Sequence, residues 1–475
     1  MRRRTFLQLS AVAPAVLFTQ AKPAGAPVVV VGAGLAGLRA AALLRQAGRQ
    51  VVVLEARERS GGRVLTVRSP FDDGLSGEAG PIRIAGAHRA VLRAVREHGL
   101  TLVPFESSNG APLDPADPKR VGLQSGAASP AGTGLRPDER GLTASALIER
   151  YVGTLPKSLS DPAATDSSST AWREYDSATW PEWLAKRGAS PEAVRVMTQG
   201  GDSSALSALY MLRQFAMLRT SSQLYKIAGG MDRLPQAMAS ALGDVVRHDA
   251  AVVRISRAAS IVIEFESRGR IERLAASHVV LAIPLTTLRQ IEFRPALSAA
   301  KEKAIGAASY YPGVRILLQS RDRFWNRAGL NGSARTAHAE IWDSAYDRQG
   351  PARGLLGATA GGAVGRKFMD MTDAQSLEYG IDLVADAFPG IRSAFEKGVV
   401  HQWAQDRWSR GAFVAFAPGQ MTALVPEIAR PEDRLHFAGE HTSSWMSWME
   451  GALESGERAA REILGSQNSK ALDRQ

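Results

Sequence analysis

Residues 28–37 have the sequence Val-Val-Val-Val-Gly-Ala-Gly-Leu-Ala-Gly and carry the strongest structural signal in the chain. The four valines predict a short buried strand. Residues 38–47 are rich in Ala, Leu and Arg, which favour a helix, and Gly48 ends it. Residues 51–55, Val-Val-Val-Leu-Glu, predict a second strand that ends in an acid. Strand, Gly-x-Gly-x-x-Gly, helix, strand and acid together predict a dinucleotide-binding βαβ unit.

Each glycine of this motif has a separate role. Gly32 allows the tight turn, Gly34 lets backbone N–H groups approach a pyrophosphate, and Gly37 lets the helix pack closely on the strand. The helix N-terminus favours phosphate charge. Glu55 follows Gly37 at close to the roughly 20-residue spacing expected for an acid that accepts hydrogen bonds from a ribose. A plain βαβ unit without a ligand is the alternative, but here every contextual element is present.

Composition narrows the class of protein. The chain has 475 residues, of which 45% are hydrophobic and 22% charged, so two or three globular units are expected. The net charge is +11, but the basic residues beyond Arg4 are dispersed, which disfavours nucleic-acid binding. Cysteine is absent, which excludes disulfides, thiolate catalysis and cysteine-ligated metals. The eight histidines show no paired-ligand spacing, so no metal site is predicted.

The N-terminus predicts an export signal. Arg3-Arg4-Thr5-Phe6-Leu7 resembles the twin-arginine pattern. The apolar stretch 6–18 is as long as a signal-peptide core and too short to span a bilayer. We therefore expect residues 1–26 to be a signal peptide recognised by the twin-arginine export machinery, which places the mature chain in the periplasm or outside a bacterial cell. An uncleaved leader is the alternative.

Further elements follow from the hydrophobic pattern. Residues 107–170 are rich in Pro, Ser, Gly, Ala and Asp and predict a long surface excursion with short helices. Helix is expected over 190–219 and in the terminal stretch 450–464. The remaining apolar runs predict strands at 251–255, 261–266, 271–274, 278–284 and 314–318, and a strand running into a glycine turn at 435–440.

Four motifs carry a resemblance to a known family. They are Glu-Ala-Arg-Glu-Arg-Ser-Gly-Gly-Arg at 55–63, Gly-Pro-Ile-Arg-Ile at 80–84, Gly-Gly-Met-Asp-Arg-Leu-Pro at 229–235, and Phe-Ala-Gly-Glu-His-Thr at 437–442 followed by Trp-Met-Glu-Gly-Ala at 448–452. They resemble the flavin amine oxidases, and most of all an L-amino acid oxidase. The last motif is the most specific, because its internal spacing is that of the amino acid oxidases.

The resemblance implies an α/β amine oxidase fold. A Rossmann-like FAD-binding domain would be built from residues 27–82, 229–290 and 427–475. A substrate-binding domain with a mixed β-sheet flanked by helices would use 83–228 and 291–426. FAD would be noncovalent, since no cysteine is present to link it.

The same resemblance assigns residues to the cofactor. Val252 would contact the adenine part, Glu440 the ribityl or pyrophosphate side, and Met449 the pyrimidine edge of the flavin. The full expected cofactor set is Gly32, Gly34, Leu35, Ala36, Gly37, Glu55, Ala56, Arg57, Gly62, Arg63, Gly80, Pro81, Ile82, Arg83, Val252, Gly439, Glu440, Trp448, Met449 and Ala452.

Substrate-site candidates follow in the same way. Arg83 lies where amino acid oxidases carry a carboxylate anchor, and its planar donor fork suits that task. Phe413 and Trp448 would be aromatic walls beside the flavin that act in catalysis as well as binding, and Trp342 is a further candidate. The simpler alternatives are core packing for the aromatics and a structural ion pair for Arg83.

One position departs from the family pattern. Oxidases of this family usually carry a lysine that holds a water near flavin N5, and counting back from Phe324 places Arg315 there. Arginine is bulkier and keeps its charge, so the reaction with oxygen is expected to differ.

The resemblance implies oxidative deamination of a small-molecule L-amino acid to a 2-oxo acid, ammonia and hydrogen peroxide, with hydride transfer to flavin N5 and molecular oxygen as acceptor. One alternative is a primary amine or polyamine oxidase, which acidic residues in the pocket would favour. A second is an exported dehydrogenase with a cytochrome or quinone acceptor, suggested by Arg315. A third is a flavin-binding module without catalysis. A homodimer is compatible with the sequence, which does not determine the oligomeric state.

Overall fold

The computed structural model describes residues 25–105, 134–142, 144–156, 159, 170–198, 203–219, 223–336, 338–345 and 352–465. The twin-arginine segment and most of the expected excursion at 107–170 lie outside these residues. Within the excursion, a helix α3 (Ala144–Val152) is described.

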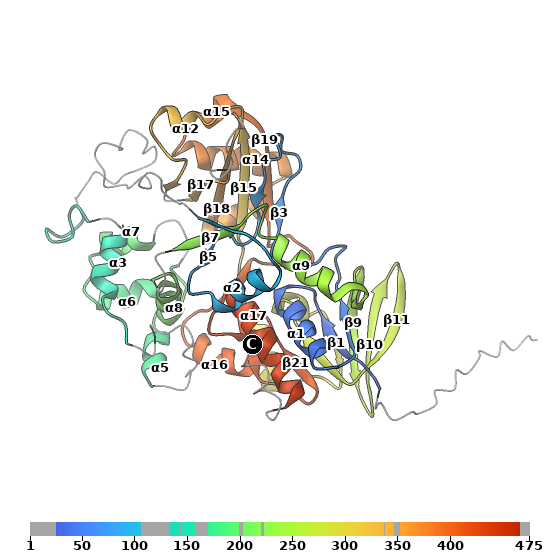
Figure 1. The fold of residues 1–475 in the computed structure, drawn as a ribbon. Coiled ribbons are helices and arrows are strands. Elements are labelled where there is room, and N and C mark those ends of the chain that lie inside the picture. The colour runs from blue at the N-terminus through green and yellow to red at the C-terminus, as the bar shows by residue number, and fades with distance from the viewer. Residues whose placement is uncertain are drawn as a thin grey trace, which may run out of the picture.

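A five-stranded parallel sheet forms the centre of the first part of the molecule (Figure 1). Its order is β21 (Leu435–Phe437), β12 (His278–Leu281), β1 (Val28–Val31), β2 (Val51–Leu54) and β8 (Val246–Arg247). All four pairings are parallel, and β1 is central. The four valines of β1 are at most 4% exposed, because a parallel sheet is covered on both faces. The Rossmann-like unit predicted from the sequence is confirmed.

Helix α1 (Leu35–Gln46) packs on this sheet beside α17 (Met449–Leu464) and α9 (Arg233–Leu242). A Cβ atom on Gly37 would lie 1.9 Å from the Gly32 carbonyl oxygen, and one on Gly456 would lie 2.3 Å from that of Ala36. Only glycine therefore fits at these two helix contacts. Among the described elements, the last helix, α17, is thus held directly against the first, α1 (Figure 1).

A second sheet extends the first part. Its order is β11 (Arg270–Ala276), β10 (Ile261–Ser267), β9 (Ala250–Arg257) and β13 (Glu292–Arg294). Strand β13 pairs with β9 just beyond residue 290, the expected end of that cofactor-domain segment. The exact division into domains stays a prediction.

The second part contains the sheet β16 (Ala334–Arg335), β17 (Glu340–Asp343), β18 (Gly354–Ala360), β15 (Val314–Ser320) and β19 (Phe395–Gln402). The resemblance implied a mixed sheet, but its four described pairings are all antiparallel. The close succession of β16, β17 and β18 along the chain suits antiparallel pairing, since a parallel pair needs a long crossover. Helices α12 (Phe324–Arg327), α14 (Asp373–Ala385) and α15 (Ile391–Ala394) accompany this sheet (Figure 1).

A helical group lies beside these two parts. It comprises α3, α5 (Thr170–Asp176), α6 (Trp180–Lys186), α7 (Pro191–Thr198) and α8 (Ala208–Arg219). The single helical region expected over 190–219 is therefore two helices, α7 and α8. The remaining sheets are small: β3 (Thr66–Val67) with β4 (Gly77–Glu78), β14 (Ser309–Tyr311) with β20 (Phe413–Ala415), and β5 (Ile84–Ala85), β7 (Leu224–Ile227) and β6 (Leu102–Pro104).

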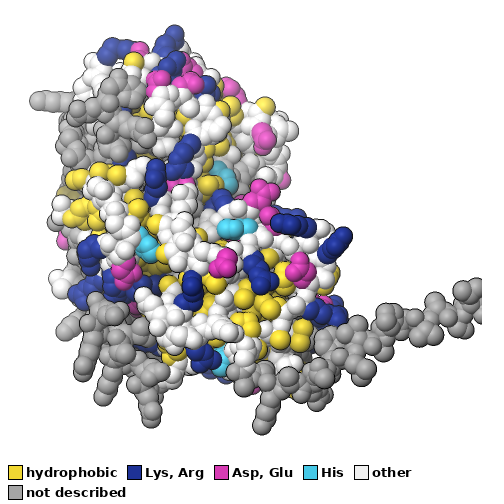
Figure 2. Space-filling model, turned by 45° about the vertical axis from the view of Figure 1, so that its right-hand side comes forward, with side chains coloured by type: hydrophobic (Ala, Val, Ile, Leu, Met, Phe, Trp, Pro, Cys, Tyr) yellow, Lys and Arg dark blue, Asp and Glu magenta, His cyan; other side chains and the backbone are white. Residues whose placement is uncertain are grey.

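The surface agrees with the dispersed charge of the sequence. On the face drawn in Figure 2, basic and acidic side chains are interspersed over the described residues. In the part of the chain that the structure describes, no helix has the length and apolar character of a membrane span, and no cluster of acidic or histidine side chains could hold a metal.

Candidate active site

A cavity of about 570 Å³ is lined by residues from both parts of the molecule. At one end lie the turn after β1 and the end of β2, and at the other lie Arg315 on β15 and Gln214 on α8. Its lining is more apolar than polar in area and includes the aromatic residues Phe413 and Trp448. A long cavity with a glycine turn at one end and aromatic walls at the other suits an extended dinucleotide with a substrate beside it.

The start of α1 forms an anion cradle at the first end. Gly32, Gly34, Leu35 and Ala36 line the cavity. No side chain caps the helix at Gly34, and its first turn contains no acid. A Cβ atom on Gly34 would meet nothing within 4 Å, so the backbone is open at this point. The helix start is thus available to a phosphate group, as the motif predicted.

Glu55 lies at the end of β2 and lines the cavity. Its carboxylate accepts hydrogen bonds from the N–H groups of Ala33 at 2.7 Å and Arg57 at 2.9 Å. Burial raises the pKa of Glu55, and these two bonds oppose that shift. The bond to Ala33 fixes the acid against the glycine turn, which is the geometry that a ribose ligand requires.

The neighbouring Arg57 reaches across the site. Its guanidinium contacts Asp406 through two hydrogen bonds, of 2.9 and 2.6 Å, and donates to the Ser409 hydroxyl at 2.9 Å. Asp406 and Ser409 lie on the segment between β19 and β20. Arg57 therefore links that segment to the end of β2. The sequence analysis did not predict Asp406 as a site residue.

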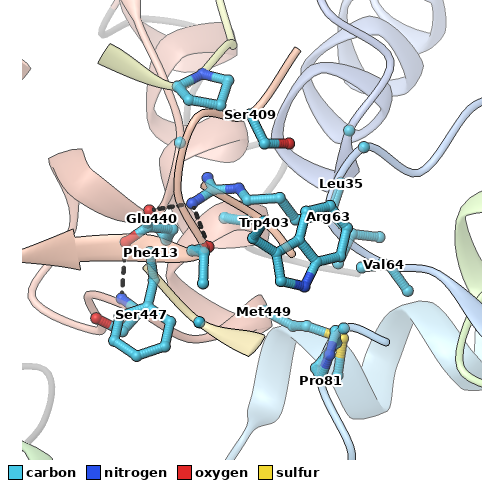
Figure 3. Close-up of a pocket in the computed structure, with 18 of the residues that line it drawn as sticks. Leu35, Arg63, Val64, Pro81, Trp403, Ser409, Phe413, Glu440, Ser447 and Met449 are labelled. Atoms are coloured by element: carbon cyan, nitrogen blue, oxygen red, sulfur yellow. Dashed lines mark hydrogen bonds and ion pairs between the residues drawn. The ribbon is translucent and has the colours of Figure 1, made fainter. Parts of the chain in front are cut away.

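Arg63 and Glu440 join the first and fourth of the four motifs (Figure 3). Arg63 donates to Glu440 Oε1 and to the Ala412 carbonyl, both at 2.8 Å. Glu440 Oε2 accepts the Ser447 N–H at 2.8 Å. Burial by itself would lower the pKa of Arg63, but the pairing with Glu440 outweighs it and the net shift is upward. Ser447 has a φ of 70°, a left-handed conformation that is uncommon outside glycine, and this bond helps to hold it.

The structure gathers the predicted cofactor residues around one space. Every member of the predicted set lines the cavity except Gly37, which lies behind the turn and allows the close packing described above. Val252 and Met449 are at the cavity wall as expected, although their individual contacts with the cofactor stay predictions. The uncapped helix start, the placed acid and the glycine turn all fit a dinucleotide such as FAD.

The aromatic wall differs in composition from the prediction. Phe413 lines the cavity and stacks on Tyr311, with ring centroids 5.1 Å apart and an interplanar angle of 10°. Trp448 also lines it, and its indole N–H donates to Gln214 Oε1 at 2.9 Å. Trp403, which sequence reasoning missed, lines it too and donates to the Ala79 carbonyl at 2.7 Å.

Three charged side chains lie at the substrate end of the cavity. Arg83 Nη1 is 3.3 Å from Glu340 Oε1, and both residues are half-buried. Arg315 Nη2 donates to the Gly80 carbonyl at 3.0 Å. Enclosure by the protein lowers the pKa of Arg315 to about 10, with Glu340 opposing the shift and Arg83 adding to it. All three side chains line the cavity, and Glu340 had no sequence signal.

Trp342 does not line this cavity, contrary to the prediction. It is 6% exposed and packs with Ile82 and Phe105, and the Arg315 guanidinium lies 5.4 Å from its ring centroid. It shares a face of β17 with Glu340 but lies two residues farther along the strand, about 7 Å away. Trp342 therefore contacts Arg315 through its ring without lining the cavity itself.

Comparison with known proteins agrees with this geometry. The family model of flavin-containing amine oxidoreductases matches residues 35–464. The chain therefore belongs to the flavin-containing amine oxidoreductases, and its cofactor is FAD.

Individual relatives are similar over nearly the whole length. A putative L-amino-acid oxidase, YobN, of Bacillus subtilis is 29% identical over 92% of this chain and 94% of its own. The L-amino-acid oxidase of Pseudechis australis is 30% identical over 94% of this chain and 88% of its own.

Solved structures share the fold. A putrescine oxidase bound to putrescine superimposes with a TM-score of 0.77 at 21% identity, over 92% of this chain and 99% of that one. Cyclohexylamine oxidase from Brevibacterium oxydans superimposes with a TM-score of 0.72 at 23% identity, over 92% and 98%. The amine oxidase fold expected from the sequence is confirmed.

Proposed function

We propose that this flavoenzyme oxidises the Cα–N bond of an L-amino acid and yields a 2-oxo acid, ammonia and hydrogen peroxide. The observation that carries the proposal is the guanidinium of Arg83 at the substrate end of the cavity. The L-amino-acid oxidases among the relatives support the same substrate class. The solved amine oxidases are less than 25% identical and bear on the fold alone.

Arg83 recognises the α-carboxylate in this proposal. A carboxylate loses hydration in a closed site, and this is costly unless the charge is paired. The guanidinium has five donors in a planar fork and can form two parallel hydrogen bonds, which fix Cα as well as bind it. The contact with Glu340 involves Nη1 and holds the fork at the cavity wall.

The aromatic residues limit the access of water to the site and restrict the orientation of the bound substrate. Phe413, Tyr311 and Trp448 present flat apolar surfaces to the cavity. An amine that binds between these rings in its neutral form has already lost its ammonium proton. Its oxidation therefore requires no strong general base. FAD, when bound, supplies the hydride acceptor. We also propose that FAD is held without a covalent bond, since the chain has no cysteine to link it.

The second candidate is an amine oxidase, and a specific observation favours it. Glu340 is an acid in the cavity wall, and such a group can bind an ammonium that lacks a neighbouring carboxylate. The ion pair with Arg83 argues for the amino acid instead, because Glu340 already faces a cation.

The substrate test compares the twenty L-amino acids with their decarboxylated amines in a peroxide-coupled assay. Arg83→Ala should lower kcat/KM for amino acids by about 10²-fold or more, since charged hydrogen bonds contribute about 1.5–3 kcal/mol each. Arg83→Lys keeps the charge without the fork and should recover only part of the loss. The exposed Arg89→Ala is a matched control that should retain activity. A wild-type preference for amines over every amino acid would establish the second candidate.

A further inference from the structure

Glu340 stands in a row of residues across the substrate-side sheet. Arg315 on β15 pairs with Thr359 on β18, and Thr359 pairs with Glu340 on β17. Cross-strand partners point to the same face, and all three residues line the cavity. Neighbouring strands lie about 4.8 Å apart, so the backbone positions of Arg315 and Glu340 are about 10 Å apart. This row therefore crosses the substrate end of the cavity, with the cation Arg315 at one end and the acid Glu340 at the other.

The charges at the other end of the cavity are already matched. Arg63 pairs with Glu440, and Arg57 pairs with Asp406. Glu55 is held by backbone N–H groups at the start of α1. Among the described lining residues, the substrate end is left with two guanidiniums and one carboxylate: Arg83, Arg315 and Glu340.

The lining of this end therefore carries one net positive charge, which a single α-carboxylate would neutralise. A second carboxylate on the substrate side chain would lie in the same closed space as Glu340. Like charges repel strongly where water is excluded. The nearby wall from α8 contributes Met211 and Gln214, which are uncharged and offer no ion pair to a side-chain carboxylate.

We propose that Glu340 is a specificity-determining residue that excludes L-amino acids with acidic side chains. The proposal rests on the proposed amino acid oxidase function and adds to it the charge of the accepted side chain. The charge of Glu340 also acts on Arg315 at the other end of the row. Burial lowers the pKa of Arg315, and Glu340 opposes that shift more than any other charged group does.

The experiment uses two isosteric substitutions, one in the substrate and one in the enzyme. L-glutamine and L-glutamate differ in side-chain charge at nearly equal shape, as do Glu340 and the Glu340→Gln variant. Wild-type holoenzyme should show a kcat/KM for L-glutamine at least tenfold above that for L-glutamate. In Glu340→Gln this ratio should fall about tenfold or more, because one repulsive charge is gone. Glu340→Asp keeps the charge and should keep the preference.

Readouts besides activity guard against a folding defect. FAD content and thermal unfolding should match the wild type in both variants. If Glu340→Gln does not fold, wild-type holoenzyme is titrated with succinamate and succinate while flavin absorbance is followed. The dicarboxylate should then bind at least tenfold more weakly.

Any of three results overturns the inference alone, and the first two are equal oxidation of L-glutamate and L-glutamine by the wild type and an unchanged ratio in a folded, FAD-loaded Glu340→Gln. Equal binding of succinate and succinamate to the wild type has the same meaning. Oxidation of amines with no amino acid accepted would overturn the proposed function itself, and this inference with it. The two failures are therefore distinguishable.

Discussion

The guanidinium of Arg63 lies 2.8 Å from Glu440 Oε1, although 377 positions separate the two residues in the chain. The pair connects the turn after β2 with the turn before α17, and both turns line the FAD cavity. Glu440 is 5% exposed and also accepts the Ser447 N–H at 2.8 Å, so the pair lies at the protein side of this cavity wall.

We expect Arg63→Ala to release FAD and to destabilise the fold. Removing one member of a buried ion pair leaves the other charge uncompensated, which costs about 3–5 kcal/mol. The double variant Arg63→Ala with Glu440→Gln removes both charges and should lose less stability than the sum of the losses in Arg63→Ala and Glu440→Gln alone. The measurements are thermal unfolding and the ratio of FAD to protein. Strict additivity of the two single effects would show that the pair is not coupled.

A second prediction concerns the electron acceptor and Arg315. The guanidinium lies at the cavity wall, where it donates to the Gly80 carbonyl, and it also contacts the ring of Trp342, which does not line the cavity. We expect it to slow flavin reoxidation by oxygen, because arginine is bulkier and keeps its charge at a position where the family resemblance implies a lysine. Arg315→Lys should therefore reoxidise faster in stopped-flow mixing with oxygen.

Anaerobic reduction by substrate is the control for this variant and should change less. Equal reoxidation rates in wild type and Arg315→Lys would remove the main reason to consider a cytochrome or quinone acceptor.

The burial of His88 predicts that the folded protein loses stability in acid. Its ring is fully buried, edge-on to Trp445 at 5.5 Å and Trp448 at 5.0 Å between ring centroids. Burial lowers the pKa of His88 to about 4. The His88 ring gains a proton near pH 6.5 in the unfolded chain but only near pH 4 in the folded chain. The folded state therefore has its full stability with respect to His88 above pH 6.5. Between pH 6.5 and 4 it loses about 1.4 kcal/mol of folding free energy per pH unit as the pH falls.

His88→Phe has no ionisable ring, so its stability should depend less on pH between 6.5 and 4 than that of the wild type. Urea unfolding at pH 8, 6 and 4.5 measures the slope, and the difference between the two proteins isolates His88 from other titrating groups. Parallel pH profiles would mean that His88 takes up its proton at the same pH in the folded and unfolded chains.

The twin-arginine motif gives the last prediction. We propose that the chain is exported by this route and expect Arg3→Lys with Arg4→Lys to retain it in the cytoplasm, because the receptor recognises the guanidinium pair. Cell fractionation of wild type and double variant is the measurement. An otherwise matched Lys22→Arg variant should be exported normally. Export of the double variant at the wild-type level would refute the signal.

Much of the cofactor half was predictable because its chemistry is local. Gly32, Gly34 and Glu55 act through turns, helix ends and strand ends whose geometry follows from adjacent residues. The substrate half was less predictable. Trp342 was expected in the pocket from a loose resemblance, but it lies farther along β17 and beneath Arg315.

The local pattern of residues 28–55 was enough to specify the βαβ unit, since hydrophobic periodicity and glycine placement act within a few turns of chain. The motif at 437–452 was enough to indicate the family. The Arg83–Glu340 pair and the stacking of Tyr311 on Phe413 depended on folding, because segments distant in sequence bring these side chains together. Contacts of that kind follow from sheet register and packing, which no short stretch of sequence encodes.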